Sequence, residues 1–209
     1  MALDLEEQEQ LDEFKAWWRQ NGKWVIAGAL AFLAVAGGVR GWQYWTAKQA
    51  TEASQLFEQT MQAVAGNDIK AVKEITGQIM ENYPRTAYSA PAAWLAGRLN
   101  YEAGDFKSAK AQFQYALDHA RDGGVEQLAR LRLAAVLFDE KDYDGALKHL
   151  AAKHDEAYAG LYAQLKGDVL VAQGKSDEAR AAYGVALQKL DDKSPLKPLV
   201  EVKLDGLGG

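Results

Sequence analysis

Cysteine is absent from the 209-residue sequence, which excludes disulfides, thiol nucleophiles and thiolate metal sites. Proline is scarce, with four residues in the chain, and runs of β-branched residues are few, so the composition favours helices. Basic residues are not in excess, since the formal net charge is −5, and this argues against a nucleic-acid partner. Apolar residues are abundant at 48%, which supports a real core and excludes disorder over most of the chain.

Residues that usually carry catalysis are few and poorly placed for it. The three histidines, His119, His149 and His154, lack the spacing of a metal site. The sequence contains no phosphate-binding loop, dinucleotide-binding, zinc-protease or nucleophile-elbow motif. We therefore expect neither an enzyme, nor a cofactor, nor a small-molecule substrate.

Charged residues are missing from Trp24 to Val39, a run of 16 residues. As a helix this run covers about 24 Å, slightly less than the hydrocarbon thickness of a bilayer. Aromatic residues gather on both sides, as they do at the two interfaces of a membrane: Trp17, Trp18 and Trp24 on one side, and Trp42, Tyr44 and Trp45 on the other. We predict a transmembrane helix over residues 24–45, preceded by a short cytoplasmic segment over residues 1–23.

A cleaved signal peptide ending at Ala34-Val35-Ala36 is the alternative, but its first region would be acidic where such signals are basic. Positive charges near the ends of the span favour an N-terminus in the cytoplasm, because three of them precede it and two follow it. The larger C-terminal part is then exported.

Two glycines in the span, Gly37 and Gly41, have the four-residue spacing that lets membrane helices approach closely. We predict a helix contact at this position. The alternative is that small residues are simply common in membrane helices.

Helical hairpins recur over residues 46–193. In the clearest unit, Gly97 and Ala109 are small where two helices are expected to cross, Gly104 ends the first helix and Asp105 caps the second. The same turn is recognisable at Gly66, Lys141 and Gly174, at separations of 38, 37 and 33 residues, close to the 34 of a tetratricopeptide repeat. The predicted fold class is all-α, with an N-terminal transmembrane helix followed by a tetratricopeptide-repeat-like α-solenoid.

The first helix of each hairpin lines the concave side of such a solenoid. Aromatic and charged residues on its free face would suit an extended or helical peptide. The predicted binding residues are Trp94, Arg98, Tyr101, Glu102, Phe138, Asp139 and Asp168. The alternative is that the aromatic residues pack between adjacent hairpins, which is the favoured interpretation for Phe138 and stays open for Trp94 and Tyr101.

The C-terminal residues 194–209 are predicted to form an extended tail. Pro195 and Pro198 break the last helix, and Val200–Asp205 alternates with period two, which would let one apolar side dock as a strand-like segment. A frayed terminus is the alternative.

The acidic lead EEQEQLDEFKAWWRQNGKW, one apolar span with aromatic ends and about four hairpins together resemble the YfgM family over essentially all 209 residues. The resemblance depends on the architecture and the lead segment, and not on a catalytic motif. It implies a bacterial inner-membrane protein with a periplasmic helical domain, acting as an ancillary subunit of the Sec translocon.

The partners that the resemblance implies are translocon subunits, a periplasmic chaperone of the PpiD type and exported protein chains. The implied role is to pass newly exported proteins to chaperones. The residues themselves leave a second interpretation open, which is a scaffold or assembly factor in another bacterial envelope complex.

Overall fold

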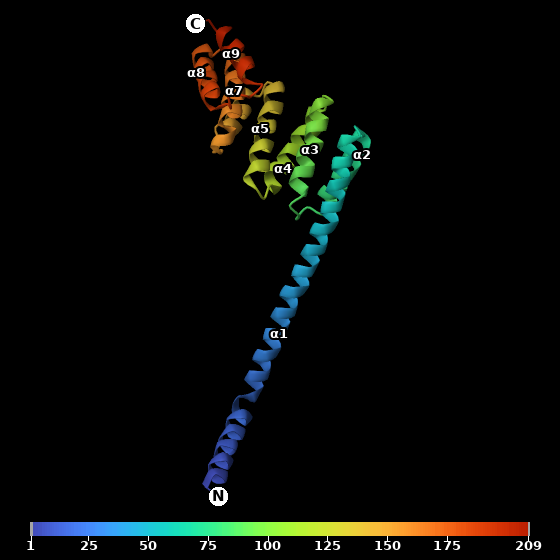
Figure 1. The fold of residues 1–209 in the computed structure, drawn as a ribbon, viewed down its shortest axis with the longest axis vertical. Coiled ribbons are helices and arrows are strands. Elements are labelled where there is room, and N and C mark those ends of the chain that lie inside the picture. The colour runs from blue at the N-terminus through green and yellow to red at the C-terminus, as the bar shows by residue number, and fades with distance from the viewer. Residues whose placement is uncertain (1, 209) are drawn as a thin grey trace. The chain divides into compact units, whose positions relative to one another are not determined.

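The computed structural model describes residues 2–208, which form helices joined by short loops (Figure 1). The chain divides into two compact units, Met1–Gln49 and Ala50–Gly209. The first helix, α1 (Ala2–Ala65), contributes to both units. The predicted all-α fold class is confirmed.

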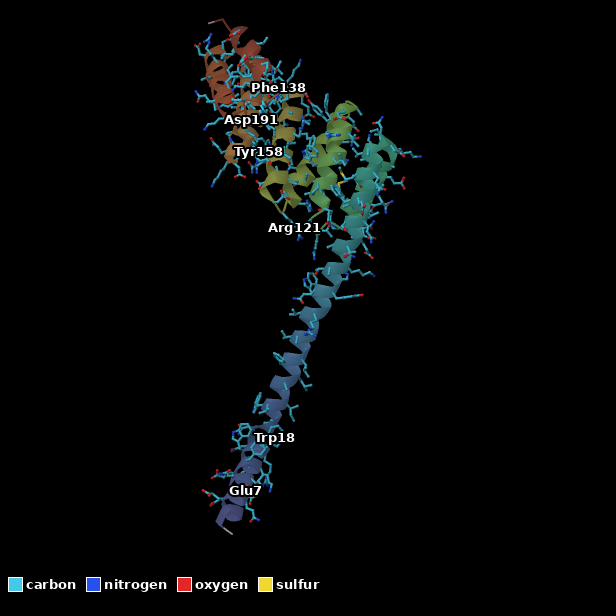
Figure 2. All side chains as sticks on the ribbon, viewed as in Figure 1. Glu7, Trp18, Arg121, Phe138, Tyr158 and Asp191 are labelled. Atoms are coloured by element: carbon cyan, nitrogen blue, oxygen red, sulfur yellow. The ribbon has the colours of Figure 1, made fainter. Side chains whose placement is uncertain are left out.

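In the first unit, the large apolar side chains of α1 from Leu11 onward are exposed. Trp24, Phe32 and Leu33 expose 71%, 72% and 64% of their surface, and Figure 2 shows Trp18 projecting from this single helix. The helix is long and apolar enough to cross a membrane, and only 6% of its most apolar window is buried within the protein. A core helix of a soluble domain would bury such residues, so the exposure is compatible with the predicted span.

Gly37 and Gly41 lie on open surface of α1. A Cβ atom added at either position would meet no atom of the described residues within 4 Å. The surface is therefore free for a second membrane helix, and that contact stays a prediction.

The second unit is a row of antiparallel hairpins. Its helices after α1 are α2 (Ile69–Asn82), α3 (Ser89–Glu102), α4 (Phe106–His119), α5 (Gly123–Asp139), α6 (Tyr143–Leu150), α7 (Glu156–Ala172), α8 (Ser176–Lys189) and α9 (Lys197–Asp205). From α2 onward each helix packs against the next, and α5 also contacts α3 and α7. The first helices of successive hairpins therefore form one layer, as in a tetratricopeptide solenoid.

In each of the four hairpins, a turn of the same kind joins the two helices. Each contains a residue with positive φ, which turns the chain sharply after the first helix; three of the four are followed by an aspartate whose carboxylate accepts a hydrogen bond from the third residue after it. The positive-φ residues are Asn67 (54°), Gly104 (77°), Lys141 (63°) and Gly174 (74°), and the capping aspartates are Asp68, Asp105 and Asp142. The predicted repeat is confirmed.

The helices cross closely where the sequence places glycine opposite an aromatic ring. A Cβ atom on Gly97 would lie 2.8 Å from the ring of Phe113, and one on Gly167 would lie 2.3 Å from the ring of Tyr183. Ala109 is fully buried at the same α3–α4 interface. The expectation that small residues mark these crossings is confirmed.

The prediction of an extended tail over residues 194–209 is wrong, because Lys197–Asp205 forms α9. Pro198 lies in the first turn of this helix, where proline is tolerated because the N–H group that it lacks has no partner there. Val200 is fully buried, and Leu196 and Leu204, four residues to either side, pack in the same cluster. The period of four outweighs the period of two that the sequence also contains.

Candidate functional site

A cavity of about 210 Å³ opens between the C-terminal part of α1, α3 and α5, all within the second unit. Its wall is apolar except for Arg98. The lining residues, which we call the Trp94 groove, are Phe57, Met61, Val64, Pro91, Trp94, Leu95, Arg98, Val125 and Leu128. The three helices are the first members of their hairpins, so the groove lies on the face that the sequence predicts to be concave.

Trp94 belongs both to the core and to the groove. Its partly buried indole packs against the apolar clusters that contain Val72, Ala93 and Phe113, and it also lines the cavity. Helix α3 holds this side chain firmly, because Leu95 and Leu99 are almost fully buried beside it. The groove therefore has one rigid aromatic wall, which is what an anchor for a partner side chain needs.

Arg98 lies one helical turn after Trp94 and places its guanidinium 6.0 Å from the centre of the indole ring. Its Nε atom is 3.3 Å from a carboxylate oxygen of Glu102, in an ion pair whose glutamate side chain is 57% exposed. Three of the predicted residues are therefore close together. A stacked arginine at such a site contributes on the order of 0.5–1 kcal/mol.

Two buried donors in this cluster make no hydrogen bond among the described residues: Nε1 of Trp94, and Nε of Arg98, whose 3.3 Å contact with Glu102 is an ion pair without hydrogen-bond geometry. Leaving a buried donor unsatisfied costs about 1–3 kcal/mol. A rotation of either side chain toward the cavity would offer the donor to a carbonyl or carboxylate oxygen of a bound polypeptide.

Tyr101 and Asp139 join neighbouring hairpins. The Tyr101 hydroxyl donates a 2.5 Å hydrogen bond to Asp139, and its ring lies 5.5 Å from that of Phe106. Burial, together with this hydrogen bond and the charge of Asp139, raises the pKa of Tyr101 to about 12. Neither residue lines the Trp94 groove, and their contacts link α3 to α5.

Phe138 also has partners within the solenoid. Its ring lies 6.1 Å from that of Tyr143, and it packs against the main core cluster. Figure 2 shows it within the row of hairpins. The interpretation that this aromatic residue packs between helices agrees with its surroundings.

Asp168 is placed differently from the sequence expectation, because it does not line the Trp94 groove. It accepts hydrogen bonds from the Lys203 amine at 2.7 and 2.8 Å and from the Tyr183 hydroxyl at 2.7 Å, and its side chain is 17% exposed. Burial and the Asp168 carboxylate raise the pKa of the Tyr183 hydroxyl. Asp168 therefore holds α9 against α7 and α8.

The α1 and α5 walls of the groove were not predicted from the sequence. Phe57, Met61 and Val64 recur at spacings of four and three, which is the pattern of one apolar helix face. This face precedes the turn at Gly66, and it lies in the same continuous helix as the apolar span, which hides the start of the first hairpin. The C-terminal part of α1 serves as the first helix of the first hairpin, and its Val64 packs beside Val72 of α2.

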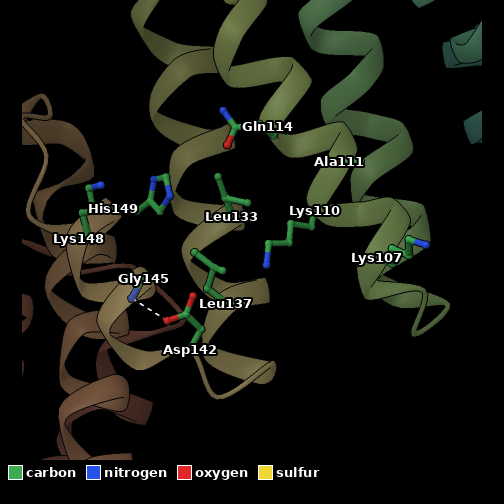
Figure 3. A pocket seen from close by; sticks show the side chains of 10 residues that line it. All are labelled: Lys107, Lys110, Ala111, Gln114, Leu133, Leu137, Asp142, Gly145, Lys148 and His149. Carbon is green, nitrogen blue, oxygen red and sulfur yellow. Dashed lines mark hydrogen bonds between the residues drawn. The ribbon is translucent and has the colours of Figure 1, made fainter.

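A second, wider hollow of about 540 Å³ lies between α4, α5 and α6 (Figure 3). Lysines from α4 and α6 surround it, and the nearly buried Leu133 and Leu137 form its floor. Lys110 is paired with Glu140 at 2.6 Å, and Asp142 accepts a hydrogen bond from the Gly145 amide. Burial, together with the charges of Arg130 and Lys148, lowers the pKa of His149 at its edge. Across residues 2–208, no group of three or more acidic or histidine side chains is arranged to hold a metal ion.

Comparison with known proteins shows a match to the family described as Tetratricopeptide repeat-like domain over residues 15–209. A Neisseria gonorrhoeae protein described as "Ancillary SecYEG translocon subunit" is 34% identical over 213 residues, which cover 99% of this chain and all of that protein. Proteins with the same description from Haemophilus influenzae and Escherichia coli are 32% and 28% identical. These alignments cover 90% and 99% of this chain, and 92% and 99% of the relatives.

Proposed function

This chain belongs to the YfgM family of ancillary SecYEG translocon subunits, and on that premise we propose that it is a protein-interaction subunit of the Sec translocon rather than an enzyme. The similarity to the Neisseria gonorrhoeae protein extends over the full length of that relative, so it includes the apolar segment as well as the hairpins. A shared order of parts over the whole chain supports a shared role more strongly than a repeat match alone.

In this proposal residues 24–45 anchor the chain in the bacterial inner membrane, with residues 1–23 in the cytoplasm and the hairpins in the periplasm. The exposed apolar surface of α1 supports the anchor. The larger number of positive charges before the span supports the orientation.

The observation that carries the proposed activity is the Trp94 groove. Its volume of about 210 Å³ is below the roughly 300–1,000 Å³ of usual small-molecule sites, so it suits a side chain of a polypeptide better than a cofactor. We assign exported protein chains as its occupants, with a periplasmic chaperone of the PpiD type receiving them afterwards.

Weak binding fits that role. Burying one Leu or Phe side chain in such a groove contributes about 1.5–3 kcal/mol, which is far less than the affinity of a permanent complex. A client held through one or two such side chains would leave quickly, as transfer to a chaperone requires.

A photo-crosslinking experiment in living bacteria tests the proposal. A photoreactive phenylalanine analogue replaces Met61, which lines the groove and is 49% exposed, and the matched control replaces Val185, which is 45% exposed on α8 and does not line the groove. We expect adducts with translocon subunits, the chaperone or exported chains from position 61, and at least severalfold fewer from position 185.

Other adducts would overturn parts of the proposal. Adducts with cytosolic proteins would contradict the orientation, and adducts with a single unrelated envelope complex would favour the scaffold function. Equal client adducts from positions 61 and 185 would contradict the groove as the client site.

A further inference from the structure

The Trp94 groove has one charged side chain in its wall, and the position of that side chain gives the groove a chemical preference. Arg98 is the only ionisable residue among the nine that line it. A basic partner segment would bring a second positive charge next to Arg98, whereas an acidic one would bring a complementary charge.

The guanidinium of Arg98 is held only by a weak ion pair in the described part of the protein. The ion pair that we find for it within residues 2–208 is the one with Glu102 on the same helix, four residues away. Exposed pairs of this kind contribute little to stability. A carboxylate arriving in the groove could replace Glu102 at small cost, and Glu102 would return to water.

The arrangement around Arg98 favours a carboxylate over a neutral acceptor. The guanidinium lies 6.0 Å from the centre of the Trp94 indole at the edge of an otherwise apolar wall, and a charge-assisted hydrogen bond there is about twice as strong as one to a neutral acceptor. Nε1 of Trp94 and Nε of Arg98, which make no hydrogen bond in the described part of the chain, add two donors to the same end of the groove.

We infer that the Trp94 groove selects polypeptide segments in which an apolar side chain is followed closely by an acidic residue. The apolar side chain contacts Trp94, and the carboxylate pairs with Arg98. Because four residues of helix α3 span about 6 Å, the two partner residues lie about 6 Å apart, which is two positions along an extended chain. This inference rests on the proposed function and names the class of client.

Purified full-length protein in neutral detergent provides the test, with the photoreactive residue at position 61. Four biotinylated peptides differ only at the two key positions: GSGSFGEGSGS, its Gln and Lys versions in place of Glu, and GSGSGGEGSGS, which lacks the phenylalanine. We expect the Glu peptide to crosslink about fivefold more than the Gln peptide and at least tenfold more than the Lys peptide.

Variants of the protein separate the local charge from general effects. Arg98→Glu should invert the order of the Glu and Lys peptides, and Arg98→Gln should remove the difference between them. Glu102→Gln should raise the yield of the Glu peptide about twofold, because it removes the competing carboxylate. Lys153→Glu, at an exposed lysine outside the groove, changes the net charge as much as Arg98→Glu and should preserve the order.

The outcomes distinguish this inference from the proposed function. Equal yields of the Glu, Gln and Lys peptides, all well above the peptide without phenylalanine, would overturn the preference for acid but leave the groove as a peptide site. No crosslinking advantage of phenylalanine over glycine would contradict the groove itself. A loss with Lys153→Glu as large as with Arg98→Glu would also overturn the inference, since overall charge would then explain it. Far-UV circular dichroism of each variant confirms that the helices have formed.

Discussion

In the α7–α8 hairpin, helices of 17 and 14 residues lie along each other, whereas in α5–α6 a 17-residue helix is paired with one of only 8. In both hairpins a small residue on one helix is followed 16 residues later by a large one on the next helix. The pair is Gly167 and Tyr183 in the first, and Ala134 and Leu150 in the second.

The two pairs fill the space between their helices with different combinations of a small and a large side chain. An aromatic ring requires glycine on the facing helix, as Gly167 shows, while Leu150 leaves room for the methyl group of Ala134, and both of these residues are buried in one core cluster. The short α6 ends at Leu150, and the hollow of Figure 3 lies beside this helix. Core volume is conserved pair by pair rather than residue by residue.

The largest effect is expected when an aromatic member of such a pair is removed. Phe113 is fully buried opposite Gly97, so Phe113→Ala should lower the free energy of unfolding by about 3–5 kcal/mol. Urea denaturation followed by circular dichroism, in neutral detergent, measures this loss. Val185→Ala, at an exposed position of α8, should change stability by less than about 0.5 kcal/mol. Equal losses would show that the glycine–aromatic contact has no special weight.

A methyl group on the small member of the pair tests the same contact from the other side. Gly167→Ala brings a Cβ atom within 2.3 Å of the buried Tyr183 ring, and we expect a loss of about 1–3 kcal/mol from overpacking. Gly184→Ala is the matched control, because its Cβ atom would meet nothing within 4 Å in the described structure. That change should stabilise α8 by about 0.5–1 kcal/mol. The contact would be unimportant if both alanines were stabilising.

Helix α9 also packs against the α7–α8 hairpin, and Lys203 of α9 is hydrogen-bonded to Asp168 of α7. Lys203→Met removes the amine that donates to Asp168 and should cost about 1 kcal/mol, since the carboxylate keeps Tyr183 as a donor. Amide hydrogen exchange should accelerate in α9 and remain unchanged in α3 and α4. Lys193→Met, at an exposed lysine, serves as the control. Uniform acceleration across all helices would indicate global destabilisation instead.

The smallest effect concerns the turn of the α5–α6 hairpin. Lys141 adopts a φ of 63°, where the neighbouring hairpins have Gly104 and Gly174 at 77° and 74°. Lys141→Gly should raise the free energy of unfolding by about 0.5 kcal/mol, because the relief of backbone strain exceeds the entropy that glycine gains when unfolded. Gly104→Ala is the reciprocal change and should cost about 1 kcal/mol. Thermal unfolding of both variants measures the two shifts, and a destabilising Lys141→Gly would contradict the strain argument.

Much of the fold could be predicted from residues that act locally. Gly104 and Asp105 determine a turn through their own backbone and side chain, and the uncharged run after Lys23 is visible without any knowledge of contacts. Trp94 and Arg98 could be placed on the free face of α3 by helical periodicity alone. These features depend on residues within a few positions of each other, so the local amino-acid sequence specifies them.

The sequence by itself therefore determined the helical hairpins, their turns and the apolar span. Only the tertiary structure decided how the segments at the two ends of the hairpin row pack against their neighbours. The C-terminal part of α1 became the first helix of the first hairpin, and Val200 drew the last residues into α9. Asp168 was paired with Lys203, 35 residues away, and the walls of the Trp94 groove came together from three helices. The physical reason is that burial and ion pairing across helices depend on surfaces supplied by distant segments, and a local pattern cannot specify which of those surfaces will meet.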